Sequence, residues 1–169
     1  MNSDKAQHIL VTAPLGFGGI TSMMINIQKN LDRAKLNFDY LVLHDRHEDL
    51  EDIVLGMGSK KIVASADEVS NKFLRGITRW YRLYRTFKDN NIKVLHLNGG
   101  PSSDMNIVFL AKLAGVKHVS FHTHNAGSAV YRNKISVVMS NAYKPLMPAF
   151  VDSFWACSSL AAQFSFPKK

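Results

Sequence analysis

Two kinds of segment alternate along the chain. Short apolar runs are followed by longer stretches in which apolar residues recur every three or four positions, the spacing of a helix with one buried face. The runs predict strands at Ile9–Ala13, Phe38–Leu43, Lys61–Val63, Val94–Leu97, His118–His122 and Ser153–Ala156. The stretches predict helices at Thr21–Leu31, Asp45–Met57, Val69–Asn90, Asp104–Ala114, Lys134–Ala142 and Ser158–Gln163. Strands separated by helices indicate βαβ units, so we expect a three-layer α/β, Rossmann-like domain with a parallel sheet of about six or seven strands.

Details inside these segments sharpen the prediction. Met24, Ile27 and Leu31 recur at helical spacing and mark the apolar side of the first helix. Gly115 follows the helix that ends at Ala114, where glycine closes a helix because it tolerates the left-handed conformation. Asp104 and Glu68 are isolated acids, and we interpret them as a helix cap and a surface charge.

Length and composition narrow the class of protein. With 169 residues, 46% of them hydrophobic, the chain can bury one sizeable core, so we expect one domain over residues 1–169. No apolar stretch reaches the ~18–20 residues of a membrane span. The N-terminal residues do not form a secretory signal, so we expect a cytoplasmic protein. The single cysteine, Cys157, follows Phe154-Trp155-Ala156 and is expected to be a buried thiol.

The formal charge of +8 and a pI near 9.7 favour binding to polyanions. Nucleic acid, an anionic membrane surface and a phosphorylated substrate all fit that charge. No helix-turn-helix, zinc or RNP-like pattern accompanies it, so we expect no nucleic-acid partner.

A glycine loop, Gly16-Phe17-Gly18-Gly19, joins the first predicted strand to the first predicted helix. The N-terminus of a helix presents unpaired N–H groups and the positive end of the helix dipole, which attract phosphate. The spacing matches neither the dinucleotide fingerprint nor the P-loop. The alternative is a tight turn that needs glycine for a positive φ.

Polar residues follow three further predicted strands. They lie at Asn98-Gly99-Gly100, His122-Thr123-His124-Asn125 and Ser158-Ser159. Ligands of parallel α/β sheets bind outside the carboxyl ends of the strands, so we expect these loops and the glycine loop to face one cleft.

Four segments of the chain together resemble a known family. GGITSMMINIQKNLDRAKLNFDYLVLH, KVLHLNGG, LAKLAGVKHVSFHTHN and DSFWACSSLAAQFSF together are similar to the N-terminal domain of retaining, GT-B-fold glycosyltransferases of family 4. The likeness is to the bacterial capsule and exopolysaccharide branch, and it covers nearly the whole chain.

The resemblance implies a function. In that family the C-terminal Rossmann-like domain grips the nucleotide-sugar donor, and the N-terminal domain binds the acceptor. The chain ends near Phe166, about where the linker to a second domain would begin, which implies an expressed half, a natural truncation or one subunit of a split enzyme. We therefore expect the acceptor-binding half of a hexosyltransferase, acting on a polysaccharide or lipid-linked glycan and inactive without its donor-binding domain. No cofactor and no protein nucleophile are implied.

The resemblance also implies roles for particular residues. Gly16 to Gly19 would approach the donor diphosphate, whose developing charge fixed N–H dipoles stabilise. Thr21 stands where the family often has an acidic residue. His124, followed by Asn125 and Gly127, would contact the transferred sugar. The other cleft or acceptor residues are His96, Asn98, His122, Asn125 and Ser158.

The histidines also have structural interpretations. We expect His122 and His124 to point to opposite faces of their strand, one toward a covering helix and the other toward the cleft. His122 is then a structural histidine with a satisfied ring, and the same alternative applies to His96 and Asn98. No cysteine or HExxH spacing accompanies the histidines, so no metal site is predicted.

The helix over residues 72–88 has two contrasting sides. Aromatic and apolar residues recur on one side: Phe73, Ile77, Trp80, Tyr81, Tyr84 and Phe87. Basic residues line the other: Lys72, Arg75, Arg79 and Arg82. One interpretation is an aromatic core face with a solvated basic back. The other places the basic side on an anionic lipid leaflet, at the inner face of the plasma membrane, as for family members with lipid-linked acceptors. The two are compatible.

Two other functions stay open. One is a nucleotide- or phosphate-binding Rossmann domain of another class, such as an epimerase or a dehydrogenase-like protein. The absent third glycine and the lack of a clear ribose-binding acid on the second strand oppose it, but that strand ends in His44-Asp45, which keeps the alternative open. The other is a non-catalytic module that binds membrane surfaces.

Overall fold

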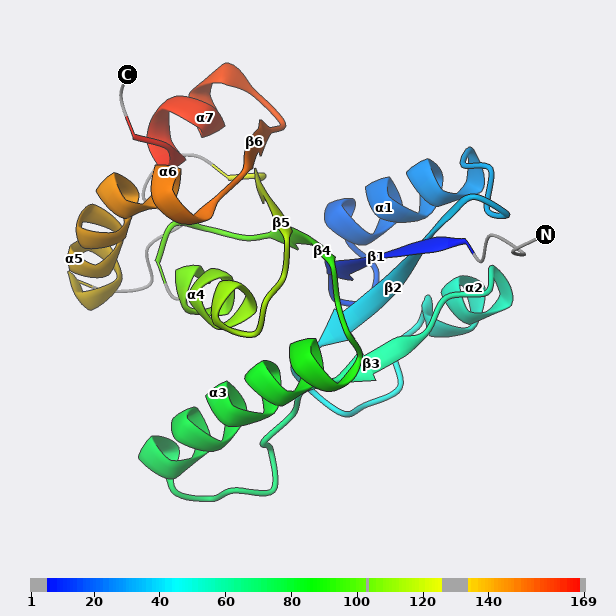
Figure 1. Cartoon of the computed structure of the whole chain (residues 1–169), viewed down its shortest axis with the longest axis horizontal. Helices are drawn as coiled ribbons and strands as arrows, with labels where there is room; N and C mark the ends of the chain where they lie inside the picture. The colour runs from blue at the N-terminus through cyan, green and yellow to red at the C-terminus, as the bar shows by residue number, and fades with distance from the viewer. Residues whose placement is uncertain (1–5, 103, 126–133, 168–169) are drawn as a thin grey trace. The chain divides into compact units, whose positions relative to one another are not determined.

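The computed structural model describes residues 6–102, 104–125 and 134–167. The chain forms two compact units, Met1–Arg82 and Leu83–Lys169 (Figure 1). Within these described ranges each unit contains three parallel strands, in the order β3-β2-β1 in the first and β4-β5-β6 in the second. These orders are the two halves of the Rossmann strand order. The predicted α/β, Rossmann-like class with parallel strands is confirmed.

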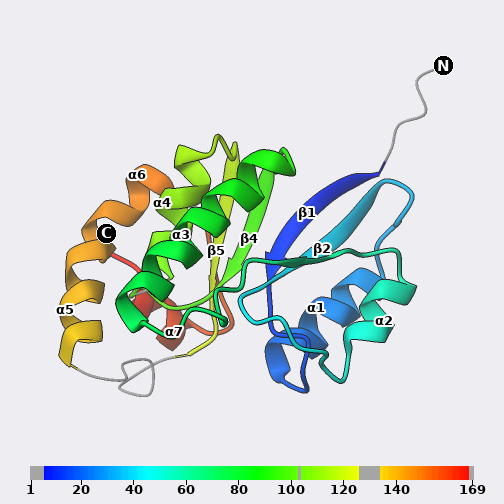
Figure 2. The ribbon, with the colours of Figure 1, turned by 90° about the horizontal axis from the view of Figure 1, so that it is seen from below.

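The first unit alternates strands and helices as its sequence predicts. Its elements are β1 (Gln7–Thr12), α1 (Gly19–Lys29), β2 (Leu36–Val42), α2 (Glu51–Gly56), β3 (Lys61–Val63) and α3 (Lys72–Asp89), the last running on into the second unit. Figure 2 shows α1 and α2 on one side of β1 and β2. Val11 and Tyr40 from the strands form a buried core with Met24 of α1 and Val54 of α2. Both helices therefore cover the same face of this sheet.

The buried side of α1 differs from the predicted one. Thr21, Met24, Ile25 and Gln28 are buried, whereas Ile27 is 42% exposed. The two polar members are tolerated inside because they are hydrogen-bonded. Gln28 Nε2 donates to Asn37 and Ser59, each over 2.6 Å, and Gln28 Oε1 accepts the Tyr40 hydroxyl over 2.9 Å.

Helix α2 begins at Glu51, six residues later than the predicted start at Asp45. The preceding residues serve the neighbouring loop instead. The carboxylate of Glu48 accepts the backbone N–H of Leu15, and Leu50 N–H donates to Leu15 O over 2.9 Å. A helix from Asp45 would remove both links, so tertiary contacts override the helical pattern.

The second unit contains the remaining elements. They are β4 (Val94–Asn98), α4 (Met105–Leu113), β5 (His118–Thr123), α5 (Lys134–Tyr143), η2 (Lys144–Leu146), α6 (Met147–Phe150), β6 (Ser153–Ala156) and α7 (Ser159–Ser165). Leu95, Leu97, Val119 and Phe121 are fully buried. Phe109 of α4 meets Tyr143 of α5 and Phe150 of α6 edge-on. Two short helices, η2 and α6, were not predicted from the sequence, and their prolines, Pro145 and Pro148, occupy first-turn positions where proline is allowed.

Two predicted helix ends can be compared directly. Gly115 has a φ of +94° after α4, which confirms its predicted left-handed conformation. Asp104 occupies the cap position of α4 without capping it through its side chain. Its carboxylate instead accepts the Gly100 N–H over 2.8 Å, which ties the loop after β4 to the start of α4.

Among the helices that the structure describes, none is at once long enough and apolar enough to cross a bilayer.

Candidate functional site

The glycine loop lies between β1 and α1, and its backbone is extended at Gly18. Gly18, the residue before α1, has φ 177° and ψ 158°, a conformation open to any residue. The positive-φ glycines of the described chain are Gly58 and Gly115, so a left-handed turn is not what requires glycine here. The alternative interpretation of this loop, a tight turn that needs glycine for a positive φ, is therefore wrong. A Cβ at Gly18 or Gly19 would meet no atom within 4 Å, which leaves room for close approach to the backbone.

The N-terminus of α1 has no side-chain cap within the described residues and no acidic residue in its first turn. Its first N–H groups and its dipole are therefore available to an anion. Phe17 is 79% exposed at the tip of the loop.

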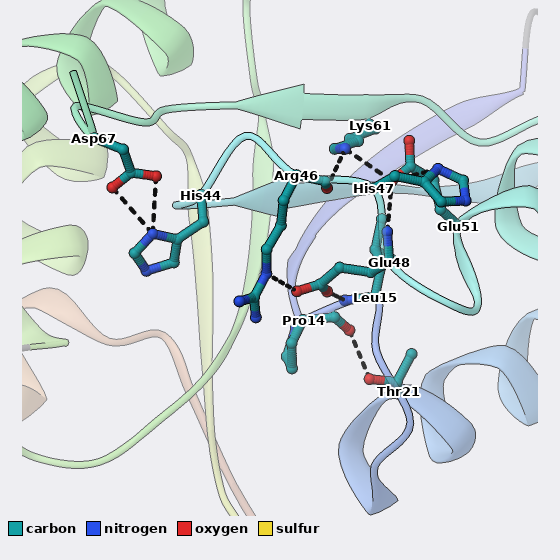
Figure 3. A network of polar contacts seen from close by, with 10 residues as sticks. All are labelled: Pro14, Leu15, Thr21, His44, Arg46, His47, Glu48, Glu51, Lys61 and Asp67. Carbon is teal, nitrogen blue, oxygen red and sulfur yellow. Dashed lines mark hydrogen bonds and ion pairs between the residues drawn. The ribbon is translucent and has the colours of Figure 1, made fainter.

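Glu48 holds the base of the glycine loop (Figure 3). It comes from the segment between β2 and α2, and Figure 3 shows it beside Leu15 with Arg46 on its other side. Its Oε1 accepts Arg46 Nε over 2.9 Å. Burial by itself would raise the pKa of Glu48, but Arg46 and the N–H groups of Leu15 and Gly16 lower it below the ordinary value. The carboxylate stays ionised and orders the loop.

Thr21 takes a structural role in the same region. It is fully buried, and its hydroxyl donates to Pro14 O over 2.6 Å. The Thr21 side chain therefore fastens the first turn of α1 to the end of β1. The acid next to this loop is Glu48, which the sequence analysis did not single out, because it lies 33 residues from Leu15 in the chain.

A polar face lies on the sheet of the second unit. Its members are His96, Asn98, Ser120, His122, His124, Ser153 and Trp155. The parallel register aligns Asn98 with His122 and His122 with Trp155, and it aligns His96 with Ser120 and Ser120 with Ser153. Residues paired across strands lie on one face, so these two rows form one surface.

The rings of this polar face are in contact. The His96 and His122 centroids are 5.3 Å apart, and those of His122 and His124 are 4.1 Å apart. The Trp155 ring lies 6.2 Å from both His96 and His122. His122 and His124 thus share a face, and the expectation that they point opposite ways is wrong. The side-chain period of a strand is two, so positions two apart point to the same side.

Hydrogen bonds fix the orientation of the histidine rings. His96 Nε2 and His122 Nδ1 lie 3.2 Å apart, a hydrogen bond in which one nitrogen donates and the other accepts according to the tautomer. His124 Nε2 lies 2.8 Å from Asn98 Oδ1, so Nε2 carries the proton that this oxygen accepts. Nδ1 of the neutral His124 ring is then an acceptor.

The three histidines are neutral near pH 7. Burial, aided by the nearby His124, lowers the pKa of His96 to about 4, although a hydrogen bond to Asn98 opposes the shift. Burial, together with His124 and His96, lowers the pKa of His122 to about 4. Burial also lowers the pKa of His124. A neutral imidazole can both donate and accept a hydrogen bond, which suits recognition of hydroxyl groups.

The remaining predicted residues lie at the ends of the strands. Asn125 is exposed directly after His124, and Gly127 lies outside the described residues. The Ser158 hydroxyl accepts Ala161 N–H over 3.1 Å and so caps α7. Cys157 is exposed rather than buried, because it lies beyond the last residue of β6, and its thiol donates to His124 O over 3.1 Å.

No three His, Cys, Asp or Glu side chains of the described ranges are arranged to hold a metal ion. The glycine loop belongs to the first unit and the polar face to the second. That the two face one cleft stays a prediction.

The basic residues of α3 turn toward the loop before the helix. Arg75 Nε donates to Val69 O over 2.7 Å, and Arg82 donates to Ser65 O. Arg79 pairs with Asp67 over 3.4 Å, and Arg82 with Glu68 over 2.6 Å. Glu68 is thus a surface acid, as predicted, and it has a partner. Lys72 is exposed.

The aromatic side of α3 is largely exposed, contrary to the prediction of a core face. The exposed fractions are 75% for Phe73, 51% for Trp80 and 59% for Tyr81, and within the helix Leu83 and Phe87 are buried. The arginines bond the loop that precedes α3, so the apolar stripe is the side of the helix that is exposed.

Comparison with known proteins gives one relative. The chain is 23% identical over 169 residues, 98% of its length, to a Bacillus subtilis (strain 168) protein named "Putative glycosyltransferase EpsF". It spans 42% of the length of that relative. No protein-family model matches the chain. No solved structure matches it either. The likeness supports a place among glycosyltransferases in general terms.

Proposed function

We propose that this chain is the acceptor-binding half of a retaining glycosyltransferase of family 4, with the GT-B arrangement of two Rossmann-like domains. It would transfer a sugar from a nucleotide-sugar to a polysaccharide or lipid-linked glycan. The likeness to EpsF along 98% of the chain is the observation that carries the proposal. The α/β fold and the polar residues at the carboxyl ends of the strands support it.

In this proposal the glycine loop receives the donor diphosphate. The N-terminus of α1 has no side-chain cap, and the space above Gly18 and Gly19 is open. Backbone N–H groups there would stabilise the charge that develops on the departing nucleoside diphosphate. Glu48 occupies the N–H of Leu15, so the anion would bind nearer to α1, away from the carboxylate.

His124 would position the transferred sugar. Its ring is held through Nε2 by Asn98, and its Nδ1 can accept a hydrogen bond from a sugar hydroxyl. His96, Asn98, His122 and Asn125 would bind acceptor hydroxyls, and Ser158 would act through the start of α7. Because the histidines are neutral, they are suited to orienting hydroxyls rather than to donating a proton. The leaving phosphate would help to deprotonate the acceptor, with no protein nucleophile.

The membrane contact is part of the same proposal. The exposed stripe of α3, Phe73, Ile77, Trp80 and Tyr81, would enter the interface of an anionic leaflet, where aromatic side chains are favoured. Lys72 and the overall charge of +8 would attract the lipid head groups. The observation that favours this placement is the exposure of the stripe.

Binding measurements on the 169-residue chain test the function. We expect lipid-linked glycans to bind, and we expect no turnover when a panel of nucleotide-sugars is added, because the donor grip belongs to a second domain. Turnover by the chain alone would contradict the assignment as one half. Binding of NAD without binding of glycans would favour the dehydrogenase-like alternative. Binding to phosphatidylglycerol vesicles with no affinity for glycans or nucleotide-sugars would favour the membrane module.

A further inference from the structure

The most unusual feature of the polar face is a large aromatic ring at its edge. Trp155 lies on β6, the outer strand of the order β4-β5-β6, and is 55% exposed. Its indole N–H points to Ser153 Oγ, 3.4 Å away, and its ring lies 6.2 Å from the His122 ring. Ser120 and Ser153 join their hydroxyls over 2.7 Å beside it.

The opposite face of the same strands is an ordinary core. Leu95, Leu97, Val119 and Phe121 are fully buried there, and Phe166 packs edge-on against Phe121. On the outer strand β6 both aromatic side chains are partly exposed, Phe154 at 40% on this opposite face and Trp155 at 55% on the polar face. The half-exposed indole of Trp155 offers an apolar ring face directly beside hydrogen-bonding groups.

The polar face has no formal charge. None of its seven members is an Asp, Glu, Lys or Arg, and its histidines are neutral near pH 7. A phosphate or carboxylate would find no cation among these side chains. An uncharged ring with hydroxyls on its edge and C–H groups on its face matches this surface. The hydroxyls can bond the polar side chains, and the C–H groups can cover the indole.

We propose that Trp155 is the stacking platform for one neutral hexopyranose ring of the acceptor glycan, with the hydroxyl edge of that ring turned toward His122 and Asn98. The C–H face of the sugar would cover the exposed indole, while imidazole, amide and hydroxyl groups would bind its oxygens. This inference rests on the proposed function and names the part of the acceptor that the site recognises.

The two tryptophans of the chain make the test internally controlled. Trp80 and Trp155 are similarly exposed, at 51% and 55%, but they lie on different elements. Their indole N–H resonances are assigned with a Trp155→Phe variant, which loses one of the two signals. The probes are methyl glucoside, methyl galactoside and N-acetylglucosamine, each added to about 100 mM because single sugars bind at millimolar levels. Uridine diphosphate and inorganic phosphate are the charged comparisons.

We expect a neutral sugar to shift the Trp155 signal and to leave the Trp80 signal unchanged. Trp155→Ala should weaken binding of that sugar about tenfold, and Trp155→Phe should weaken it less because a ring remains. Circular dichroism of both variants would show that the fold is kept.

Three other outcomes would overturn the inference. If sugars shift the His124 ring signals but not Trp155, the platform is wrong and the proposed function stands. If uridine diphosphate shifts Trp155 and no sugar does, the surface binds a nucleotide base, and the acceptor-side assignment fails as well. If none of the sugars shifts either group, the sugar site is wrong and the acceptor role loses its support.

Discussion

His122 and His124 lie side by side on one face of the second sheet, with their ring centroids 4.1 Å apart and their planes inclined by 34°. Burial lowers the pKa of both His96 and His122, and the neighbouring His124 lowers each further because a positive charge on one ring opposes a positive charge on the next. The folded chain therefore favours the neutral form of these rings.

The stability of the protein should depend on pH for this reason. The pKa of His122 is about 4 in the folded chain and 6.5 ordinarily. Between these values the unfolded chain binds a proton that the folded chain does not, so stability is lost as the pH falls from 6.5 to 4. For one such histidine the loss is on the order of 3 kcal/mol. Urea unfolding at several pH values measures it, and His122→Asn should flatten the profile. An unchanged profile in the variant would assign the pH dependence to other groups.

His124 should matter for catalysis more than for folding. In a protein that also contains the donor-binding domain, His124→Ala should lower the catalytic rate by about two orders of magnitude, the scale for one positioned transition-state hydrogen bond. His122→Ala should chiefly lower stability. His118→Ala is the control, because His118 lies at the start of β5, whereas His124 follows the end of that strand, and it bonds Ser153 from an exposed position. Equal rates for the His124 and His118 variants would refute the role of His124.

Gly99 should tolerate no side chain. A Cβ at Gly99 would lie 2.5 Å from Asp104 Oδ2, the oxygen that accepts the Gly100 N–H. Gly99→Ala should therefore destabilise the protein by about 1–3 kcal/mol. Gly76, inside α3, has no atom within 4 Å of such a Cβ. Gly76→Ala should stabilise by about 0.5–1 kcal/mol, because alanine loses less entropy in a helix. Thermal unfolding of both variants checks the opposite signs, and a shift in the same direction would disprove the argument.

Glu48 should support the glycine loop through its charge. Glu48→Gln keeps the shape but weakens the acceptor for Leu15 N–H and for Arg46, so we expect a loss of about 1–2 kcal/mol in the free energy of unfolding. Asp49→Asn removes an exposed neighbouring charge and should change little. Urea titrations compare the two variants. Matching midpoints would mean that the carboxylate is not needed.

The apolar stripe of α3 should decide membrane binding. Phe73→Ser combined with Tyr81→Ser should release the protein from phosphatidylglycerol vesicles in co-sedimentation, with an unchanged circular dichroism spectrum. Charge reversal at Arg75, Arg79 and Arg82 is a less clean test, because these arginines also hold the loop over residues 65–70. Arg85→Ala, which removes a positive charge of α3 and its exposed ion pair with Asp89, is the matched control. Retention of the double variant on vesicles would remove the stripe from the proposal.

The sequence alone determined the order and type of most elements. Apolar runs and helical spacing are local properties, so β3 and β6 were predicted at their observed bounds and the other strands to within two residues. The α/β class followed from their alternation, and the left-handed Gly115 from its place after a helix. The glycine loop was found in the same way, since its residues are neighbours in the chain.

Only the tertiary structure decided which side chains meet. Gln28 and Thr21 are buried because other segments satisfy their polar groups, Tyr40 of β2 for Gln28 and Pro14 for Thr21, whereas Ile27 is exposed. Glu48 reaches Leu15 across 33 positions, and that contact shortened α2. The polar face arises from the register of β4, β5 and β6, which places Trp155 beside His122. Register and long-range hydrogen bonds depend on three-dimensional packing, and no local pattern in the sequence encodes them.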